Sequence, residues 1–309
     1  MSNLKGKDIL SGAQFSRDDI DAILSTADDF RKKLAKQPGL DLLRGYVMAA
    51  LFFEPSTRTR LSFETAMHRL GGAIIGFSSG ESTSITKGET LIDTIRTVDT
   101  YVDVFAMRHP AIGSAAQAAE VAVHPVLNGG DGAGQHPTQA LLDAYTMKVE
   151  RGKLDGKTIV LCGDLKNGRT VHSGVQIYRN FDVNLRFVAP DQLKMPTEIT
   201  EQLKKEGVKF EETDDLNKAM KGADFLYMTR IQKERFADPA EYEKLKDAFI
   251  LNREMIDKIN PKLTVMHPLP RVSEIATDVD DLSGAAYFRQ AGNGVYVRMA
   301  LIAMVLGKA

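Results

Sequence analysis

Short apolar runs that suit β-strands alternate with segments of helical periodicity along almost the whole chain. Four such runs lie in the first half and five in the second, at residues 47–53, 73–77, 103–107, 125–127, 158–162, 184–189, 208–210, 224–229 and 264–267. Strands that alternate with helices are typical of parallel sheets with helices on both faces, because each parallel connection must cross back over the sheet. The pattern therefore predicts an α/β fold.

The length of the chain predicts two domains. A chain of 309 residues is long for one hydrophobic core, and two domains of roughly 150 residues each are the natural division. The charged segment at residues 150–157, which glycines punctuate, separates a helical pattern from a strand. We expect one domain over residues 1–150 with a C-terminal helix in residues 293–309, and another over residues 151–292. Each should be a mainly parallel sheet flanked by helices.

The predicted C-terminal helix is an apolar segment at residues 295–306. It follows Gly292, Asn293 and Gly294.

Charge and cysteine content limit the classes of protein that fit. The chain has 40 Lys and Arg against 41 Asp and Glu, so no general positive field gathers nucleic acid and any anion site must be local. The single cysteine, Cys162, lies in an apolar run and suits a buried thiol in a reducing compartment. No segment reads as a signal peptide or approaches the ~20 apolar residues of a membrane span. We expect a cytoplasmic protein that binds neither membrane nor nucleic acid.

Residues 52–60, Phe-Phe-Glu-Pro-Ser-Thr-Arg-Thr-Arg, carry the most specific local signal. A helical apolar face and a glycine pair that ends it follow, at Phe63, Ala66, Met67, Leu70, Gly71 and Gly72. Residues 56–59 therefore lie at a helix N-terminus, where backbone N–H groups favour an anion and Arg58 and Arg60 add forked donors. The alternative is a capping Ser or Thr before surface arginines, but first turns usually prefer acidic residues. The segment predicts a site for a phosphate ester.

Chemically active residues also follow other predicted strands. In open α/β sheets ligands bind beyond the carboxyl ends of the strands. Six segments with chemically active side chains occupy such positions, at residues 56–60, 108–110, 135–139, 163–169, 229–232 and 267–271. Because they come from both halves of the chain, they predict an active site in a cleft between the two domains.

A dinucleotide site is a weaker interpretation of one of these segments. Gly163 and Gly168 take the first and last glycine positions of a G-x-G-x-x-G pattern. The middle position, which lets the backbone approach a pyrophosphate, is Leu165.

Three histidines precede proline but lack the spacing of a zinc site. Because a residue before proline avoids the helix, each should lie at a strand end or a helix entrance. A packing or turn role is expected for His109 and His267. His136 differs, since Gln135 and Gln139 flank it with neutral groups that suit a polar carbonyl or amide.

Two further features are weak alone. Lys87 lies in a loop, residues 82–88, that is too rich in Ser and Thr to form a strand or helix readily. Arg169, Arg230 and Arg271 each follow a predicted strand, and a dicarboxylate needs at least two such guanidinium groups.

In combination these motifs resemble the catalytic chains of the aspartate/ornithine carbamoyltransferase family, nearly from end to end. The matching segments are residues 56–60, 107–110, 136–139, 168–173, 228–235 and 267–271. Aspartate is the expected acceptor, because its two carboxylates suit Arg169 and Arg230, whereas the distal amine of ornithine would be repelled. The ornithine enzymes also have a cysteine in their equivalent of residues 267–270, and here the only cysteine is Cys162.

The resemblance implies transfer of the carbamoyl group of carbamoyl phosphate to L-aspartate in pyrimidine biosynthesis, with no metal and no other cofactor. It implies that the phosphate is held by Ser56, Thr57, Arg58, Thr59 and Arg108. The carbamoyl end would be bound by Arg108, His136, Gln139 and the main-chain carbonyls of Leu269 and Pro270. Aspartate would be bound by Lys87, Arg169, Arg230, Gln232 and Leu269. The catalytic groups would be Arg58, Thr59, Arg108 and His136.

The family also implies a homotrimer, because a serine and a lysine of an adjacent subunit complete each active site. Lys87 matches that lysine and Ser84 is our choice for the serine, with Ser82 as the alternative because the loop varies in length. Asn167 stands where close relatives often have Tyr. Whether separate regulatory chains also bind stays open.

Two alternatives to this function stay open at the level of sequence. One is a carbamoyltransferase for another acceptor, such as ornithine. The other is a catalytically silent structural or regulatory relative, which we would expect to have lost an arginine or His136.

Overall fold

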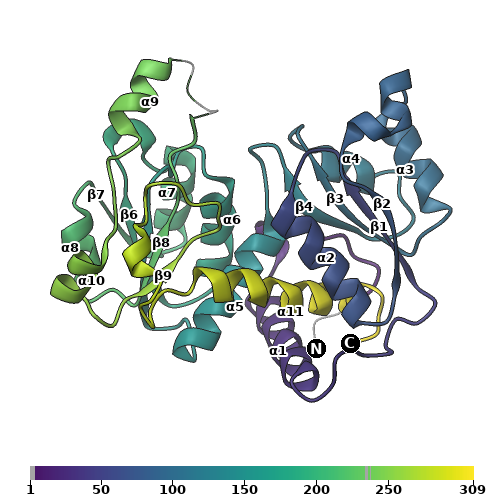
Figure 1. Ribbon diagram of the computed structural model, residues 1–309, viewed down its shortest axis with the longest axis horizontal. Coiled ribbons are helices and arrows are strands. Elements are labelled where there is room, and N and C mark those ends of the chain that lie inside the picture. Colours follow the sequence, from purple (N-terminus) through teal and green to yellow (C-terminus); the bar gives the residue numbers. More distant parts are fainter. Residues whose placement is uncertain (1–3, 234–235, 237) are drawn as a thin grey trace. The chain divides into compact units, whose positions relative to one another are not determined.

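The computed structural model describes residues 4–233, 236 and 238–309, and the chain divides into two compact units (Figure 1). The first unit comprises Met1–Tyr145 with Gly292–Ala309, and the second comprises Thr146–Ala291. Each contains one parallel sheet, of four and five strands respectively. The prediction of two α/β domains, each a parallel sheet with flanking helices, is confirmed.

The sheet of the first unit has the strand order β2-β1-β3-β4. Its strands are β1 (Val47–Phe52), β2 (Ala73–Phe77), β3 (Val104–His109) and β4 (Val126–Asp131). β4 is buried along its whole length and β1 almost so, as expected of parallel strands covered on both faces. β2 lies at one edge and is mostly exposed.

The register of this sheet brings polar residues to one edge. Phe52 at the end of β1 lies opposite Arg108 on β3, and His109 lies opposite Asp131 on β4. Because all four strands run parallel, the segments that follow β1, β3 and β4 all start at the carboxyl ends of the strands, on the same side of the sheet.

Capping side chains and a glycine mark helix ends in the first unit. They are α1 (Arg17–Leu34), α2 (Thr57–Arg69), α3 (Leu91–Asp99) and α4 (Ser114–Ala119), while α5 (Pro137–Arg151) and α11 (Tyr287–Val305) each span both units. The α1 cap is a capping box, in which Ser16 and Asp19 each accept a hydrogen bond from the other's backbone N–H. α2 ends before Gly71, whose φ of 86° is left-handed. The apolar face predicted for α2 is confirmed, because Phe63 and Leu70 are fully buried.

The sheet of the second unit has the strand order β7-β6-β5-β8-β9. Its strands are β5 (Lys157–Cys162), β6 (Val183–Val188), β7 (Lys209–Thr213), β8 (Phe225–Met228) and β9 (Thr264–Met266). Its helices are α6 (Arg169–Tyr178), α7 (Thr197–Lys205), α8 (Leu216–Met220), α9 (Pro239–Leu245) and α10 (Arg253–Ile259). Cys162 lies in the core with Leu226 and Val265, as predicted, and burial raises the pKa of its thiol.

All nine predicted strands form, and β4 and β7 extend furthest beyond their apolar runs. β4 continues through Gly129, where a Cβ atom would lie 3.0 Å from the carbonyl oxygen of Met107, so the glycine favours this close approach to β3. β7 continues through Glu211 and Glu212, because an edge strand that faces water accepts charged side chains.

The predicted start of the C-terminal helix is wrong. α11 begins at Tyr287 and runs through Gly292, Asn293 and Gly294, whereas the sequence predicts a helix that follows these residues. A Cβ atom at Gly294 would lie 2.5 Å from Nη1 of Arg298 and 3.1 Å from Cδ2 of Leu142, so the glycine leaves room for the buried arginine and for α5. Packing therefore outweighs the helix-breaking tendency of glycine. Neither α11 nor any other helix in the described ranges is long and apolar enough to cross a membrane.

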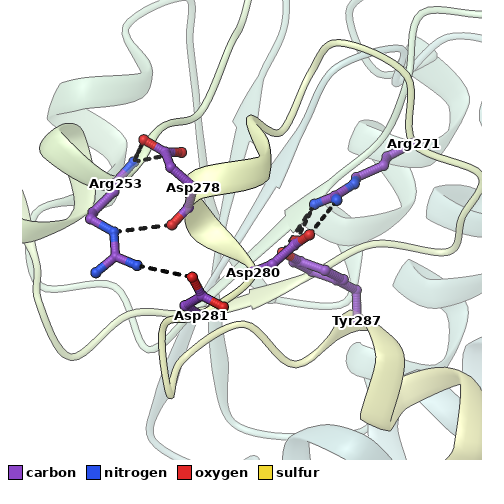
Figure 2. A network of polar contacts seen from close by, with 6 residues as sticks. All are labelled: Arg253, Arg271, Asp278, Asp280, Asp281 and Tyr287. Atoms are coloured by element: carbon purple, nitrogen blue, oxygen red, sulfur yellow. Dashed lines mark hydrogen bonds and ion pairs between the residues drawn. The ribbon is translucent and has the colours of Figure 1, made fainter.

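Ion pairs anchor the segment between β9 and α11 (Figure 2). The guanidinium of Arg271 makes two bonds to the carboxylate of Asp280, one of them 2.6 Å long from Nη2 to Oδ2, and the hydroxyl of Tyr287 donates to Asp280 as well. Nearby, Nε of Arg253 donates to the carbonyl oxygen of Asp278 at 3.0 Å. The segment that carries residues 267–271 is thereby tied to the start of α11.

Candidate functional site

The junction of β1 and α2 forms the predicted helix N-terminus. Ser56 is the N-cap with an extended backbone, and within the described chain its hydroxyl makes no capping hydrogen bond. Thr57, Arg58 and Thr59 occupy the first turn, and Thr59 is buried. The first turn, all of which is described, holds no acidic residue. The helix dipole and the first-turn N–H groups thus favour an anion here.

Two arginines influence each other electrostatically at this junction. The pKa of Arg58 is lowered by the loss of water around its guanidinium and by the like charge of Arg108. Arg108, which extends from the end of β3, donates from Nε to Oε1 of Glu54 over 2.6 Å. Like charges held together in this way are stabilised when an anion binds between them.

Arg60 is engaged elsewhere, contrary to the expectation that it adds a donor to the anion site. Its Nε lies 2.7 Å from Oε1 of Glu64, one turn along α2. The pair is an i,i+4 ion pair on the helix surface, so Arg58 is the first-turn arginine that remains at the site.

The exit of β4 leads to the first turn of α5. His136 precedes Pro137 at the helix entrance, as predicted, and is buried together with Gln139. Nε2 of Gln139 donates to Oδ1 of Asp143 at 2.8 Å. A Cβ atom at Gly129 would lie 3.4 Å from Cγ2 of Thr59, which shows how closely β4 and α2 approach.

A buried arginine joins α2 and α5 below the site. Nη2 of Arg298 on α11 donates to Oγ1 of Thr138 at 3.2 Å, and its guanidinium lies 4.9 Å from the ring centroid of Phe63. Phe63 is one turn beyond Thr59, and Thr138 lies between His136 and Gln139. The predicted phosphate and carbamoyl residues of the first unit are therefore neighbours.

The loop that carries Lys87 is more regular than predicted. It forms two short 3₁₀ helices, Gly80–Ser82 and Ser84–Lys87. Hydroxyl oxygens of Ser79 and Thr83 accept hydrogen bonds from the backbone at their starts, which stabilises a segment that propensity alone disfavours. Ser84 and Lys87 are exposed, and the side chain of Ser82 lies outside what the structure describes.

In the second unit, the exits of β5 and β8 lie against each other. A Cβ atom at Gly163 would lie 2.2 Å from the carbonyl oxygen of Thr229, and the φ of this glycine is 121°. Arg169 begins α6 after the β5 exit, and Arg230 and Gln232 follow β8. Nε2 of Gln232 lies 3.4 Å from the carbonyl oxygen of residue 167. Three of the predicted aspartate residues, Arg169, Arg230 and Gln232, thus come from two adjacent loops, whereas Leu269 follows β9 and Lys87 lies after β2.

Asn167 stabilises the β5–α6 loop through hydrogen bonds within the loop. Its backbone N–H donates to Oδ1 of the buried Asp164 at 2.9 Å, and its side-chain amide donates to the same carboxylate at 3.1 Å. The residue therefore has a local structural role. Of the matching segment 228–235, Glu234 and Arg235 lie outside the described residues.

His267 packs as predicted after β9. It is buried, its Nε2 lies 2.7 Å from Oε1 of Glu274, and its Nδ1 accepts from the N–H of Leu269 at 2.7 Å. Burial opposes the ionisation of Glu274, but the bond from His267 holds its pKa below the ordinary value. The histidine thus supports Leu269, whose φ of 57° is left-handed, and Pro270 after it.

His109 also has the predicted packing role. Its ring lies edge-on to Phe53, with 4.8 Å between the ring centroids, and its Nδ1 accepts from the N–H of Ala111 at 3.0 Å. Burial lowers the pKa of His109, which favours the neutral ring.

Sequence analysis missed the acidic partners of the site. Glu54 stands within the most informative segment but received no role, and its bond to Arg108 joins residues 54 positions apart. Asp143 follows Gln139 at i+4 on α5, a spacing that brings side chains together on a helix and could have signalled the pair. Among the described residues, no three His, Cys, Asp or Glu side chains are grouped so as to hold a metal ion.

The structure groups the predicted residues by unit. Ser56, Thr57, Arg58, Thr59, Ser84, Lys87, Arg108, His136 and Gln139 belong to the first unit. Arg169, Arg230, Gln232, Leu269 and Pro270 belong to the second. Their meeting in a cleft stays a prediction.

Two family models match consecutive parts of the chain. Residues 7–149 match the carbamoyl-P binding domain of the aspartate/ornithine carbamoyltransferases, and residues 155–305 match their Asp/Orn binding domain. Together the two models cover nearly the whole sequence.

Individual proteins are similar over the same length. An aspartate carbamoyltransferase catalytic subunit from Thermococcus kodakarensis is 54% identical over 98% of both chains. A crystal structure of aspartate transcarbamoylase from Trypanosoma cruzi with carbamoyl phosphate and aspartate has a TM-score of 0.93, 46% identity and 98% coverage of both chains. The same enzyme with N-(phosphonacetyl)-L-aspartic acid matches with the same TM-score and identity, over 98% of this chain and 97% of that one. The chain therefore belongs to the aspartate/ornithine carbamoyltransferase family.

Proposed function

We propose that this protein transfers the carbamoyl group of carbamoyl phosphate to the amino group of L-aspartate, which yields N-carbamoyl-L-aspartate and phosphate for pyrimidine biosynthesis. The observation that carries the proposal is the electrostatic coupling of Arg58 and Arg108 at the N-terminus of α2, where positive charge favours a doubly charged phosphate. The similar Trypanosoma cruzi enzyme binds both substrates.

In this proposal the first unit binds carbamoyl phosphate. Ser56, Thr57, Arg58 and Thr59 hold the phosphate, and Arg108 bridges it to the carbonyl oxygen. His136 and Gln139 bind the carbamoyl end, with the carbonyl groups of Leu269 and Pro270. The proposed domains are residues 1–150 with 293–309, which bind carbamoyl phosphate, and residues 151–292, which bind aspartate.

The second unit binds aspartate. Arg169 and Arg230 suit its two carboxylates, because a guanidinium group matches a carboxylate with two parallel hydrogen bonds. Gln232 and Lys87 complete the aspartate contacts.

The reaction needs positioning more than covalent catalysis. The neutral amine attacks the carbonyl carbon, the C–O bond to phosphate breaks, and the departing phosphate accepts the proton that the amine releases. Carbamoyl phosphate is an activated anhydride, so the protein has to align the reactants and stabilise the oxyanion. Thr59, Arg108 and His136 are the donors for that oxygen.

We further propose a cytoplasmic homotrimer whose active sites are shared, with Ser84 and Lys87 supplied by the adjacent subunit. Both residues are exposed in the single chain, as a contribution to a neighbour requires. Regulatory chains that bind this trimer are compatible with the same arrangement.

The test is an assay of the purified protein with carbamoyl phosphate and either L-aspartate or L-ornithine. We expect N-carbamoyl-L-aspartate to form and citrulline to be absent, because the arginines of the second unit repel the distal amine of ornithine. Citrulline as the main product would overturn the choice of acceptor. Failure to carbamoylate either amine would indicate a catalytically silent relative.

A further inference from the structure

Gln139 and Asp143 form a hydrogen-bonded pair one turn apart on α5. Nε2 of Gln139 donates to Oδ1 of Asp143 at 2.8 Å. Asp143 has no solvent exposure, whereas Gln139 retains 9%. Gln139 is therefore the less buried member of the pair, and Asp143 supports it from the interior.

The chemistry of the pair determines which way the glutamine amide is turned. An ionised carboxylate only accepts hydrogen bonds, so the amide must present its NH₂ group to Asp143. The amide oxygen and nitrogen diverge from the same carbon, so Oε1 remains as an acceptor away from Asp143. The orientation follows from the identity of the partner and needs no choice between similar atoms.

Asp143 is itself supported by buried charge. Arg298 is only 2% exposed, and burial lowers its pKa to about 10, a shift that the negative charge of Asp143 opposes. Its bond to Thr138 and its place against the Phe63 ring hold the guanidinium between α2 and α5. A buried carboxylate beside such a cation keeps a defined position.

We propose that Asp143 is a positioning residue that turns the oxygen of the Gln139 amide toward the NH₂ group of the carbamoyl donor. The inference rests on the proposed function, in which Gln139 binds that group. A methyl group in place of NH₂ cannot donate, and it would leave a buried acceptor without its hydrogen bond. The pair therefore lets the site distinguish carbamoyl phosphate from an acyl phosphate of the same shape.

The test compares carbamoyl phosphate with acetyl phosphate, which carries that methyl group. Initial rates with L-aspartate give the KM for carbamoyl phosphate and the inhibition constant for acetyl phosphate. In the unmodified protein we expect the ratio of the two constants to favour the carbamoyl compound by about tenfold, as one hydrogen bond allows. In Asp143→Asn the ratio should fall toward one, because an asparagine can donate to Oε1 as well as accept and no longer selects one orientation.

A matched control separates positioning from general damage to the core. Thr138→Val removes the hydroxyl that Arg298 contacts but leaves the Gln139–Asp143 bond in place. It should lower thermal stability and leave the selectivity ratio unchanged. A merely structural role of Asp143 would make Asp143→Asn behave like this control.

A double-mutant cycle tests whether Asp143 acts through Gln139. Once Gln139→Leu has removed the amide, adding Asp143→Asn should change the ratio no further. Should Asp143→Asn fail to fold by circular dichroism, Asp143→Leu combined with Arg298→Met removes both buried charges together, and its ratio should also approach one.

The outcomes separate the inference from the function on which it rests. Formation of N-carbamoyl-L-aspartate by the unmodified protein upholds the function. If Asp143→Asn, or the paired variant where the single one does not fold, then keeps the unmodified selectivity ratio, the positioning role alone is overturned. If the unmodified protein forms no carbamoylated product, the function and the inference both fail.

Discussion

At the residue scale, the proposed phosphate site depends on two arginines of like charge, Arg58 and Arg108. Loss of water around its guanidinium and, to a smaller extent, the like charge of Arg108 lower the pKa of Arg58, and Arg108 pairs with Glu54 through a bond of 2.6 Å. A phosphate that binds between the two guanidinium groups competes with Glu54 for Arg108. Arg58 is thus the residue whose charge the phosphate compensates most directly.

Arg58→Ala should therefore lower turnover by about 10²–10³-fold while the fold stays intact, as expected for loss of a donor to developing negative charge. The neighbouring Arg60→Ala is the matched control. Arg60 pairs with Glu64 on the surface of α2 at 2.7 Å, so its loss should change turnover little. Steady-state kinetics and circular dichroism of both variants check this, and equal activities would contradict the assignment of Arg58.

Gly163 brings the loops after β5 and β8 together, so Gly163→Ala should separate the predicted aspartate residues. The added Cβ would lie 2.2 Å from the carbonyl oxygen of Thr229, and we expect a loss of at least about 2 kcal/mol in the free energy of unfolding. The KM for aspartate should rise more than the KM for carbamoyl phosphate.

Gly207→Ala is the control for backbone strain alone. Gly207 has a similarly positive φ of 72°, but in the described part of the chain nothing lies within 4 Å of the Cβ position. Its substitution should cost about 1 kcal/mol and leave both KM values unchanged. Denaturant unfolding and initial rates compare the two variants, and identical effects would show that the contact with Thr229 is unimportant.

At the scale of elements, the segment between β9 and α11 owes its position to an ion pair. Arg271 and Tyr287 both donate to Asp280 (Figure 2). The bond from Arg271 lowers the pKa of Asp280 below its ordinary value of 3.8, although burial works against this shift and the Tyr287 bond assists it. The same segment carries Leu269 and Pro270.

The lowered pKa of Asp280 makes the stability depend on pH in a defined direction. The unfolded carboxyl takes up a proton near pH 3.8, above its pKa in the folded protein. The stabilisation is therefore fully present above about pH 5 and is lost as the pH falls through the folded pKa.

Asp280→Asn should lower the free energy of unfolding by about 2 kcal/mol at pH 7, because charge-assisted hydrogen bonds are lost. The difference between variant and unmodified protein should shrink as the pH approaches 3. Urea unfolding between pH 7 and pH 3 measures it, and two curves that stay parallel would contradict the account.

Sequence patterns predict which helices and strands form better than they predict the residues at which each begins and ends. All nine strands were found because apolar runs and strand burial coincide in parallel sheets. The start of α11 was missed because Gly294 serves a close approach to Leu142, a tertiary contact that no local pattern reveals. The bond between Glu54 and Arg108 was missed for the same reason, since it joins residues from two strand exits.

At the scale of the whole molecule, the proposed site depends on residues of another chain. Lys87 follows β2, the exposed edge of its sheet, and is itself exposed. The resemblance to the family, and no pattern in the sequence alone, pointed to this residue. In a single chain, an exposed lysine has no feature that marks it as a residue of an active site.

A shared site predicts that two inactive variants restore each other. In a trimer mixed from Arg58→Ala and Lys87→Ala chains, some sites combine an intact Arg58 with an intact Lys87 from the neighbour. Random assembly in a closed ring would make about a quarter of the sites complete. Activity of the refolded mixture against each variant alone measures this, and a mixture as inactive as its parents would contradict sharing.

The central claim is that the basic residues of both units converge on one ligand. Titration calorimetry with N-(phosphonacetyl)-L-aspartic acid, which joins a phosphonate to an aspartate, tests it directly on the unmodified protein, Arg58→Ala and Arg169→Ala. The account predicts one site per chain and affinity weakened by about 100-fold or more in each variant, because each loses a forked, charge-assisted contact. Unchanged affinity in either variant would contradict it.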